Sequence, residues 1–203
     1  MTIELHNAGK RFNRDWIFRH LDYTFKEGER YAIIGNNGSG KSTLLQCLSG
    51  AMELNAGKMT FPDNLQVENL YQKIAIAAPY LELIEEMTAK ELLLFHSSFK
   101  PLMTFLSIEE ILSEINLSDA INKQIRFYSS GMKQRLKLAQ AIFSNIPVLL
   151  LDEPCTNLDA KGYELYHQLI KKYAQDKTII VSSNDKNEYR FCNEIIDIRG
   201  YKK

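Results

Sequence analysis

The sequence is poor in the features that mark membrane-spanning, secreted and nucleic-acid-binding proteins. No apolar run approaches the ~18–20 residues that cross a bilayer, and the N-terminal residues 1–6 lack the charged-then-apolar pattern of a signal peptide. Cys47, Cys155 and Cys192 form no C-x-x-C pair and cannot all be joined in disulfides, which favours a reducing compartment. The 25 basic and 25 acidic side chains cancel to a formal net charge of +0, which argues against electrostatic binding to nucleic acid. We therefore expect a cytosolic protein that only another protein could hold at a membrane.

The remaining composition is ordinary for a globular protein. The 203 residues, 45% hydrophobic and 25% charged, predict a single domain over residues 1–203 with a sizeable core. No internal repeat or low-complexity tract interrupts the chain. The histidines at positions 6, 20, 96 and 167 are scattered and suggest no metal site.

One glycine-rich stretch is the most informative feature of the sequence. It reads Gly35-Asn36-Asn37-Gly38-Ser39-Gly40-Lys41-Ser42-Thr43 and fits the phosphate-loop pattern G-x-x-x-x-G-K-[ST]. An apolar strand pattern precedes it, and a helical pattern follows it up to Gly50. In this interpretation the loop N–H groups hold phosphate oxygens, Lys41 reaches the β- and γ-phosphates, and the Ser42 hydroxyl ligates Mg²⁺. The alternative is a glycine-rich turn that enters a core helix.

The rest of the chain alternates between strand and helix patterns. Short strands are expected within residues 1–34 and at 56–62, 74–78, 178–181 and 195–196, with a loop over 63–73. Apolar residues recur with helical spacing over 105–115 and 166–173, and residues 92–95 belong to another helix. These patterns predict an α/β protein with a mostly parallel core sheet and a helical insert over roughly residues 80–145.

Two carboxylates end the strongest strand pattern. The apolar run over residues 148–151 leads directly into Asp152 and Glu153. Ligands of open parallel sheets lie beyond the carboxyl ends of the strands, so both side chains are expected to face whatever the phosphate loop binds. Asp152 would then help to hold Mg²⁺, and Glu153 would accept the proton of an attacking water. The alternative is a solvated strand end without a catalytic role.

A third motif begins another helix. The stretch Tyr128-Ser129-Ser130-Gly131-Met132 precedes a helical run over residues 133–141. By itself it is a polar helix cap, with Ser129 or Ser130 as a good N-cap residue. A Ser-Gly pair at a helix start is also a site for anions.

Taken in order, the phosphate loop, this helix start and the Asp-Glu strand end resemble the ATP-binding cassette (ABC) ATPases. Thr156-Asn157-Leu158-Asp159 is similar to the D-loop of that family, and Phe12 falls at its adenine-stacking aromatic. The resemblance covers essentially the whole chain. It implies a phosphate-loop NTPase fold of ABC type with an N-terminal antiparallel β subdomain. Packing within the fold is the alternative role for Phe12.

The resemblance also implies cofactors and partners. Two cassettes, as a homodimer or a heterodimer, would enclose two ATP molecules with Mg²⁺, and Ser129, Ser130 and Gly131 of one domain would cap the γ-phosphate held by the other. Closing and opening of the pair would drive an integral membrane transporter subunit. This chain would then lie on the inner face of the cell membrane, with the segment 79–87 lining the groove for that subunit and no nucleic acid as partner.

Two positions depart from the family pattern. Ala78-Pro79-Tyr80 stands where the Q-loop glutamine is expected, and Asn184 replaces the switch histidine. Asparagine can donate a hydrogen bond to a γ-phosphate but stays uncharged near neutral pH. We therefore expect a working but slow ATPase, or one paired with a more standard partner. Two alternatives stay open: a soluble ABC ATPase that acts on ribosomes, chromatin or DNA, and a binding module without turnover.

Overall fold

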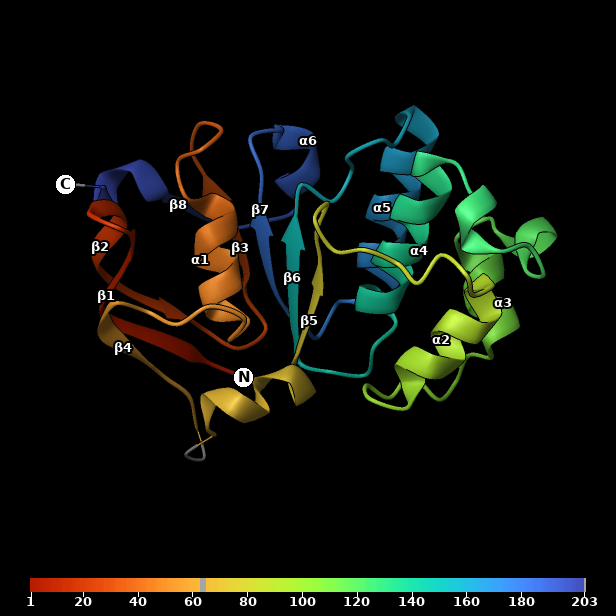
Figure 1. The fold of residues 1–203 in the computed structure, drawn as a ribbon, viewed down its shortest axis with the longest axis horizontal. Helices are drawn as coiled ribbons and strands as arrows, with labels where there is room; N and C mark the ends of the chain where they lie inside the picture. Colours follow the sequence, from red (N-terminus) through yellow and green to blue (C-terminus); the bar gives the residue numbers. More distant parts are fainter. Residues whose placement is uncertain (63–64, 203) are drawn as a thin grey trace.

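A computed structural model describes residues 1–62 and 65–202 of the chain and contains two sheets (Figure 1). The antiparallel sheet has the order β2-β1-β4 and consists of β1 (Ile3–Phe12), β2 (Asp15–Phe25) and β4 (Ala56–Thr60). The parallel sheet has the order β5-β6-β7-β3-β8 and consists of β3 (Arg30–Ile34), β5 (Ile74–Ala77), β6 (Val148–Asp152), β7 (Thr178–Ser182) and β8 (Glu194–Asp197). The predicted fold class, an α/β core with an N-terminal antiparallel subdomain, is confirmed.

Helices connect the strands of the parallel sheet. The α-helices are α1 (Lys41–Leu48), α2 (Ala89–Ser97), α3 (Ile108–Glu114), α4 (Ser130–Ile142), α5 (Ala160–Tyr173) and α6 (Lys186–Tyr189). Short 3-10 helices are η2 (Val67–Gln72), η3 (Ser118–Ala120), η4 (Ile125–Phe127) and η5 (Ile198–Tyr201). Within the described part of the chain, no helix is long and apolar enough to cross a membrane.

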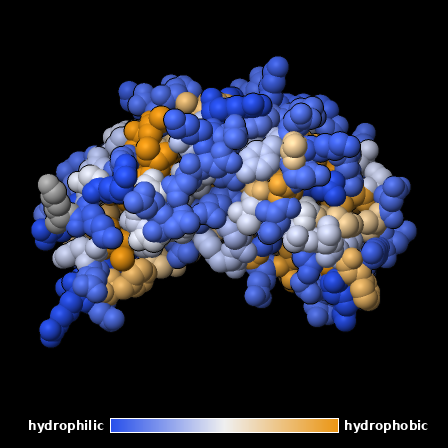
Figure 2. All heavy atoms as spheres, turned by 90° about the horizontal axis from the view of Figure 1, so that it is seen from above, coloured by the Kyte–Doolittle hydropathy of each residue, from blue (hydrophilic) through white to orange (hydrophobic). Residues whose placement is uncertain are grey.

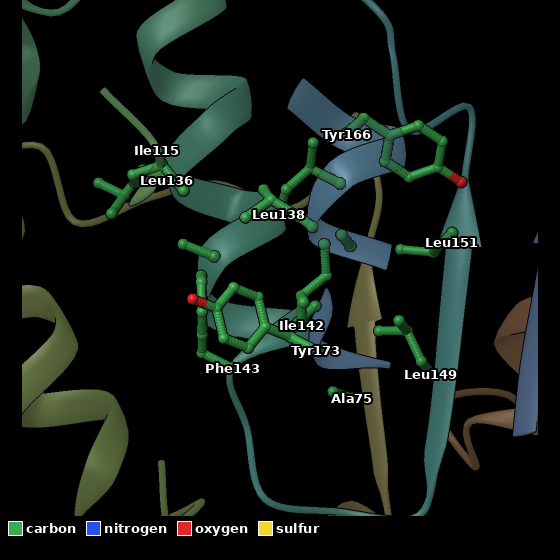
Figure 3. Close-up of a cluster of buried hydrophobic side chains, with 14 of the residues drawn as sticks. Ala75, Ile115, Leu136, Leu138, Ile142, Phe143, Leu149, Leu151, Tyr166 and Tyr173 are labelled. Carbon is green, nitrogen blue, oxygen red and sulfur yellow. The ribbon is translucent and has the colours of Figure 1, made fainter. Parts of the chain in front are cut away.

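The parallel sheet is buried on both faces, which explains its unbroken apolar strands. Along β6, Leu149 and Leu151 join the core cluster that contains α4 and α5, whereas Val148 and Leu150 join the cluster that contains α1. Figure 3 shows Leu149 and Leu151 directed toward side chains of α4 and α5. Burial of each such leucine stabilises the fold by about 1.5–3 kcal/mol. The strand that carries Asp152 is therefore held firmly between two layers of helices.

The antiparallel subdomain follows the predicted alternation of apolar and polar residues. Ile3, Leu5, Leu21 and Phe25 are buried, and their polar neighbours face outward. The ring of Phe25 packs edge-on against that of Tyr31 on β3, with 5.0 Å between the centroids. This contact joins the antiparallel sheet to the strand that leads into the phosphate loop.

The helices α2, α3 and α4 all lie between β5 and β6 in the sequence, in the stretch predicted as a helical insert. Both α2 and α3 begin with a capping box, in which Thr88 pairs with Glu91 and Ser107 pairs with Glu110. Isolated helices this short are marginal in water, so these caps and the packing against α4 stabilise them. The boundary of a single domain over residues 1–203 stays a prediction.

Two sequence expectations about local structure are wrong in part. Phe105 precedes α3, is 69% exposed and stacks on Tyr173, with 6.5 Å between the ring centroids. The segment expected as a loop over 63–73 contains η2, because Leu70 is fully buried and draws the backbone inward. Residues 63 and 64 lie outside the described residues.

The three thiols are free and shielded from solvent. Cys47 and Cys155 are buried, and Cys192 is half-buried. Burial raises the pKa of Cys47 to about 11 and that of Cys192 to about 12. All three are therefore protonated and poorly nucleophilic at neutral pH.

Candidate nucleotide site

The phosphate loop links the carboxyl end of β3 to the start of α1. Gly40, directly before the helix, has a left-handed backbone with φ 105°. A Cβ atom at this position would lie 2.3 Å from Cγ2 of Ile17 on β2. Only glycine satisfies both the backbone angle and this close approach. The motif glycine therefore lets the loop curl against the antiparallel sheet and still begin a helix.

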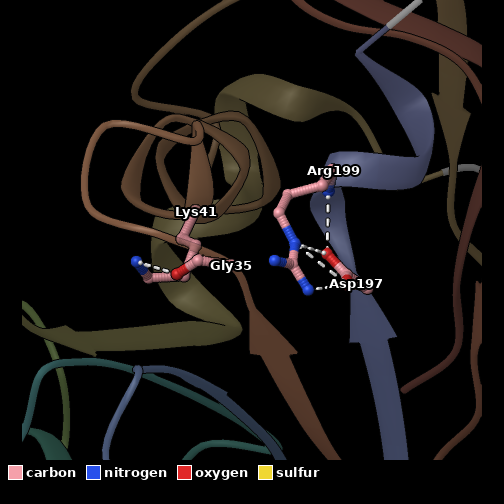
Figure 4. A network of polar contacts seen from close by, with 4 residues as sticks. All are labelled: Gly35, Lys41, Asp197 and Arg199. Carbon is pink, nitrogen blue, oxygen red and sulfur yellow. Dashed lines mark hydrogen bonds and ion pairs between the residues drawn. The ribbon is translucent and has the colours of Figure 1, made fainter.

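Lys41 is folded back over the loop. Its side chain is 5% exposed, and Nζ donates hydrogen bonds to the backbone oxygens of Gly35 at 2.9 Å and Asn36 at 3.3 Å. Figure 4 shows the ammonium group directed at Gly35 and, beside it, Arg199 bound to Asp197. Because carbonyl oxygens are weaker partners than phosphate oxygens, the Lys41 ammonium is ready to exchange them for an anion.

Asp152 ends β6 beside the loop, where its carboxylate is buried. The side chain is 2% exposed, and Oδ1 has no hydrogen-bond partner among the described residues. The hydroxyl of Ser39 in the loop also has no partner among the described residues. The same is true of Ser182 on β7, which is paired with Asp152 on the neighbouring strand β6. Buried polar atoms without partners are costly, so these atoms indicate a place for a polar ligand. Mg²⁺ binds oxygen ligands such as carboxylates and hydroxyls, so the residues present fit that ion.

Glu153 and the phosphate loop share one cleft. The cleft has a volume of about 190 Å³ and is lined by Ile17, Asn37, Gly38, Gly40, Lys41, Ser42, Thr43 and Glu153. Glu153 has a left-handed backbone with φ 42°, and its N–H donates to the Ser182 carbonyl oxygen at 2.9 Å. The turn after β6 thus places Glu153 against the loop, although the two lie more than a hundred residues apart in sequence.

The segment after β7 reaches the same loop. Asn184 donates a hydrogen bond from Nδ2 to Oδ1 of Asn37 at 2.6 Å. Phe12 lies at the end of β1, is 46% exposed and has the Lys10 ammonium 5.6 Å from its ring centroid. Phe12 does not line the phosphate-loop cleft described above. The structure therefore brings Asn184 to the loop and leaves Phe12 exposed at the hairpin that joins β1 to β2.

The helix start at residues 129–131 forms a second, separate cavity. Ser129 is the N-cap of α4, and its Oγ accepts a hydrogen bond from the Met132 N–H at 3.2 Å. Ser129, Ser130 and Gly131 line a cavity of about 450 Å³ together with the segment 157–159. This cavity and the phosphate-loop cleft have no lining residue in common. Viewed from above, where the parallel strands end, the surface is mostly hydrophilic (Figure 2).

Three polar residues near the site were given no role by sequence reasoning. The pKa of Tyr80 is raised, mainly by burial. A hydrogen bond with Gln46 on α1 opposes this rise, and the charge of Asp152 adds to it. Tyr80 lies in the segment where a glutamine was sought, and its hydroxyl forms a hydrogen bond with Gln46. The other two, Gln134 and Glu188, are buried polar side chains. The sequence did contain one signal for Gln134. It lies one helical turn before Leu138, on the apolar face of the helix, where a polar side chain is expected to be buried and paired.

Comparison with known proteins gives a consistent result. The family model described as ABC transporter matches residues 18–156. The chain is 33% identical over 196 residues to the uncharacterized ABC transporter ATP-binding protein YybJ of Bacillus subtilis, covering 92% of this chain and 87% of the relative. It is 31% identical to the Nod factor export ATP-binding protein I of Burkholderia lata, covering 99% and 69% of the two chains.

Among solved structures, the dimeric bacterial ABC transporter cassette MJ0796 is 27% identical and superposes with a TM-score of 0.83, covering 97% of this chain and 94% of that one. The same cassette, bound to ADP and Pi in a post-hydrolysis state, gives a TM-score of 0.81. The phosphate loop, the facing carboxylates and these similarities agree. The chain therefore belongs to the ABC transporter family, as an ATP-binding subunit whose hydrolysis of ATP is coupled to transport.

Proposed function

We propose that this chain binds ATP with Mg²⁺ in the cleft between the phosphate loop and the end of β6, and hydrolyses it within a pair of cassettes. The observation that carries the proposal is the shared cleft of Lys41, Ser42 and Glu153, with the unpaired Asp152 carboxylate beside β7. The pair would energise a separate transmembrane subunit from the inner face of the cell membrane. The names of the export and transport relatives support that partner.

The loop and Lys41 bind the phosphates. Lys41 Nζ exchanges the carbonyl oxygens of Gly35 and Asn36 for β- and γ-phosphate oxygens, and the N–H groups at the start of α1 add the positive end of the helix dipole. Ser42 and Asp152 are the residues that would hold Mg²⁺. When bound, the ion neutralises charge on the phosphates. Phe12 is the proposed surface on which adenine stacks.

Glu153 and Asn184 act on the reacting groups. The Glu153 carboxylate accepts a proton from the water that attacks the γ-phosphate, and its fixed turn keeps the carboxylate at the cleft. Asn184 Nδ2, which donates to Asn37, donates instead to a γ-phosphate oxygen. Both steps require positioning more than chemistry, which suits phosphoryl transfer.

A second cassette completes each site. Ser129, Ser130 and Gly131 line a cavity of their own, where their N–H and hydroxyl groups would face a nucleotide held by the partner. The dimeric form of the cassette MJ0796 supports this arrangement. The groove of about 420 Å³ between the segment 79–85 and α4, which includes Glu85 and Lys133, is the proposed docking place of the transmembrane subunit.

The test uses Glu153→Gln in the purified chain, with Glu164→Gln on the exposed face of α5 as the matched control. Removal of the base is expected to lower turnover by about 10²–10⁴-fold while ATP binding survives. The control should keep wild-type turnover. If Glu153→Gln hydrolyses ATP at the wild-type rate, Glu153 is not the base. If the wild-type chain binds ATP without turnover, alone or with its membrane partner, the chain is a binding module.

A further inference from the structure

The turn that carries Glu153 is held by two buried side chains from different helices. Glu153 has φ 42°, a backbone angle that non-glycine residues adopt only where surrounding contacts enforce it. The turn is closed by a hydrogen bond from the Thr156 N–H to the Glu153 carbonyl oxygen at 3.1 Å. Two side chains from outside the turn add further hydrogen bonds to it, so they help to set the position of Glu153.

The first of these hydrogen bonds comes from a side chain of α4. Gln134 lies one helical turn after Ser130, is 3% exposed, and donates from Nε2 to the Pro154 carbonyl oxygen at 2.7 Å. A buried glutamine is rare unless its amide is paired, and here the donor goes to the residue next to Glu153. The hydrogen bond therefore joins the helix that begins at the Ser129–Gly131 cavity to the turn at the nucleotide cleft.

The second hydrogen bond comes from a side chain of α6. Glu188 is 4% exposed, and its Oε1 accepts a hydrogen bond from the Cys155 N–H at 2.7 Å. The Tyr166 hydroxyl donates to the Glu188 carbonyl oxygen at 3.0 Å and fixes α6 against α5. Gln134 and Glu188 thus bind the carbonyl oxygen and the N–H of one peptide group, between Pro154 and Cys155, from opposite sides.

We propose that Gln134 and Glu188 are positioning residues that set the Glu153 carboxylate and tie it to α4. The proposal rests on the proposed function, because α4 begins with the segment that caps the partner's nucleotide. A shift of α4 on closure is transmitted through Gln134 and Pro154 to Glu153 of the same chain. Occupation of one site of the pair then promotes hydrolysis at the other.

The experiment measures ATP binding, kcat and the Hill coefficient of hydrolysis for Gln134→Leu, which keeps the volume and removes the donor. The half-buried Gln140 on the same helix gives the control Gln140→Leu. We expect Gln134→Leu to lower kcat by about 10-fold or more and the Hill coefficient toward one, with ATP affinity within about 2-fold of wild type. The control should change none of these quantities.

A second pair of variants separates positioning from folding. Glu188→Gln keeps an acceptor oxygen for the Cys155 N–H, whereas Glu188→Leu leaves that amide unpaired. We expect Glu188→Gln to restore most of the kcat that Glu188→Leu loses, and this pair decides the question if Gln134→Leu does not fold. Unchanged kcat in folded Gln134→Leu, or an equal loss of kcat and ATP affinity, overturns the proposal. Absence of turnover in the wild-type chain would instead contradict the proposed function.

Discussion

At the scale of single residues, Gly40 combines two constraints that can be separated experimentally. Gly28 also has a left-handed backbone, with φ 75°, but no heavy atom lies within 4 Å of a Cβ built there. We expect Gly28→Ala to cost about 1–2 kcal/mol of unfolding free energy from the backbone alone. Gly40→Ala adds the clash with Ile17 and should cost clearly more.

Urea unfolding and ATP binding of the two variants check this. Gly40→Ala should also lose ATP binding, because the loop must move to relieve the clash, whereas Gly28→Ala should keep it. Equal destabilisation of the two variants would show that Ile17 yields freely to the added methyl group.

Asn184 brings no titratable group to the phosphate loop. An asparagine has no titration near neutral pH, so this position contributes no step to the wild-type pH–rate profile. We expect Asn184→His to introduce a change in kcat near pH 6.5, the ordinary pKa of histidine. Steady-state kinetics from pH 5.5 to 8.5 measure it. A profile identical to that of the wild type would mean that the side chain at 184 does not reach the reacting phosphate.

At the scale of elements, α2 is tied to the end of α4 by a histidine that folding keeps neutral. His96 Nε2 lies 2.9 Å from the Ser144 hydroxyl, which itself donates to the Gln140 carbonyl oxygen at 2.6 Å. Burial, with a further contribution from the Lys100 charge, lowers the pKa of His96 from 6.5 to about 4. Because the unfolded chain binds this proton more readily, stability is lost as the pH falls from 6.5 to about 4.

The matching variant is His96→Gln, whose amide can still donate to Ser144 and does not titrate. Thermal unfolding at pH 7 and pH 5 should show a smaller loss of stability at pH 5 for the variant than for the wild type. An equal loss in both proteins would assign the acid sensitivity to other groups.

The elements also show why some features were predictable from the sequence and others were not. The phosphate loop and the Asp152-Glu153 strand end are local patterns, in which a few consecutive residues determine both backbone and role. Gln134 binds Pro154, and Glu188 binds Cys155, across 20 and 33 positions of sequence. Such pairs depend on how α4 and α6 pack, which no local pattern encodes. Phe105 was placed on a helix for a related reason: its spacing fits, but the Ser107 cap begins α3 after it.

At the scale of the whole molecule, the phosphate-loop cleft is lined by Ile17 of the antiparallel sheet and by Glu153 after a strand of the parallel sheet, so nucleotide binding there should stabilise both parts of the fold. At an ATP concentration of about 100 times Kd, linkage predicts about 2.7 kcal/mol. For a chain of this size, that corresponds to a rise in Tm of about 5–11 °C. Lys41→Ala should abolish the rise, whereas Lys58→Ala on the exposed edge strand β4 should keep it.

Differential scanning fluorimetry with ATP and Mg²⁺ measures the shift. A full shift in Lys41→Ala would show that nucleotide binds elsewhere on the chain. The Glu153→Gln protein, in which hydrolysis is blocked, should elute as a dimer when ATP is present.

Cys155 contributes the N–H of the peptide group that Gln134 and Glu188 bind. It is 2% exposed, and burial, together with the Glu188 and Asp185 charges, raises its pKa. An alkylating reagent can therefore reach the Cys155 sulfur only while the hydrogen bonds from Gln134 and Glu188 to the turn are broken. The rate of alkylation divided by that of an open thiol equals the fraction of time that the turn spends open. Alkylation of the native Cys155, followed by mass spectrometry, therefore reports how often the turn that carries Glu153 opens.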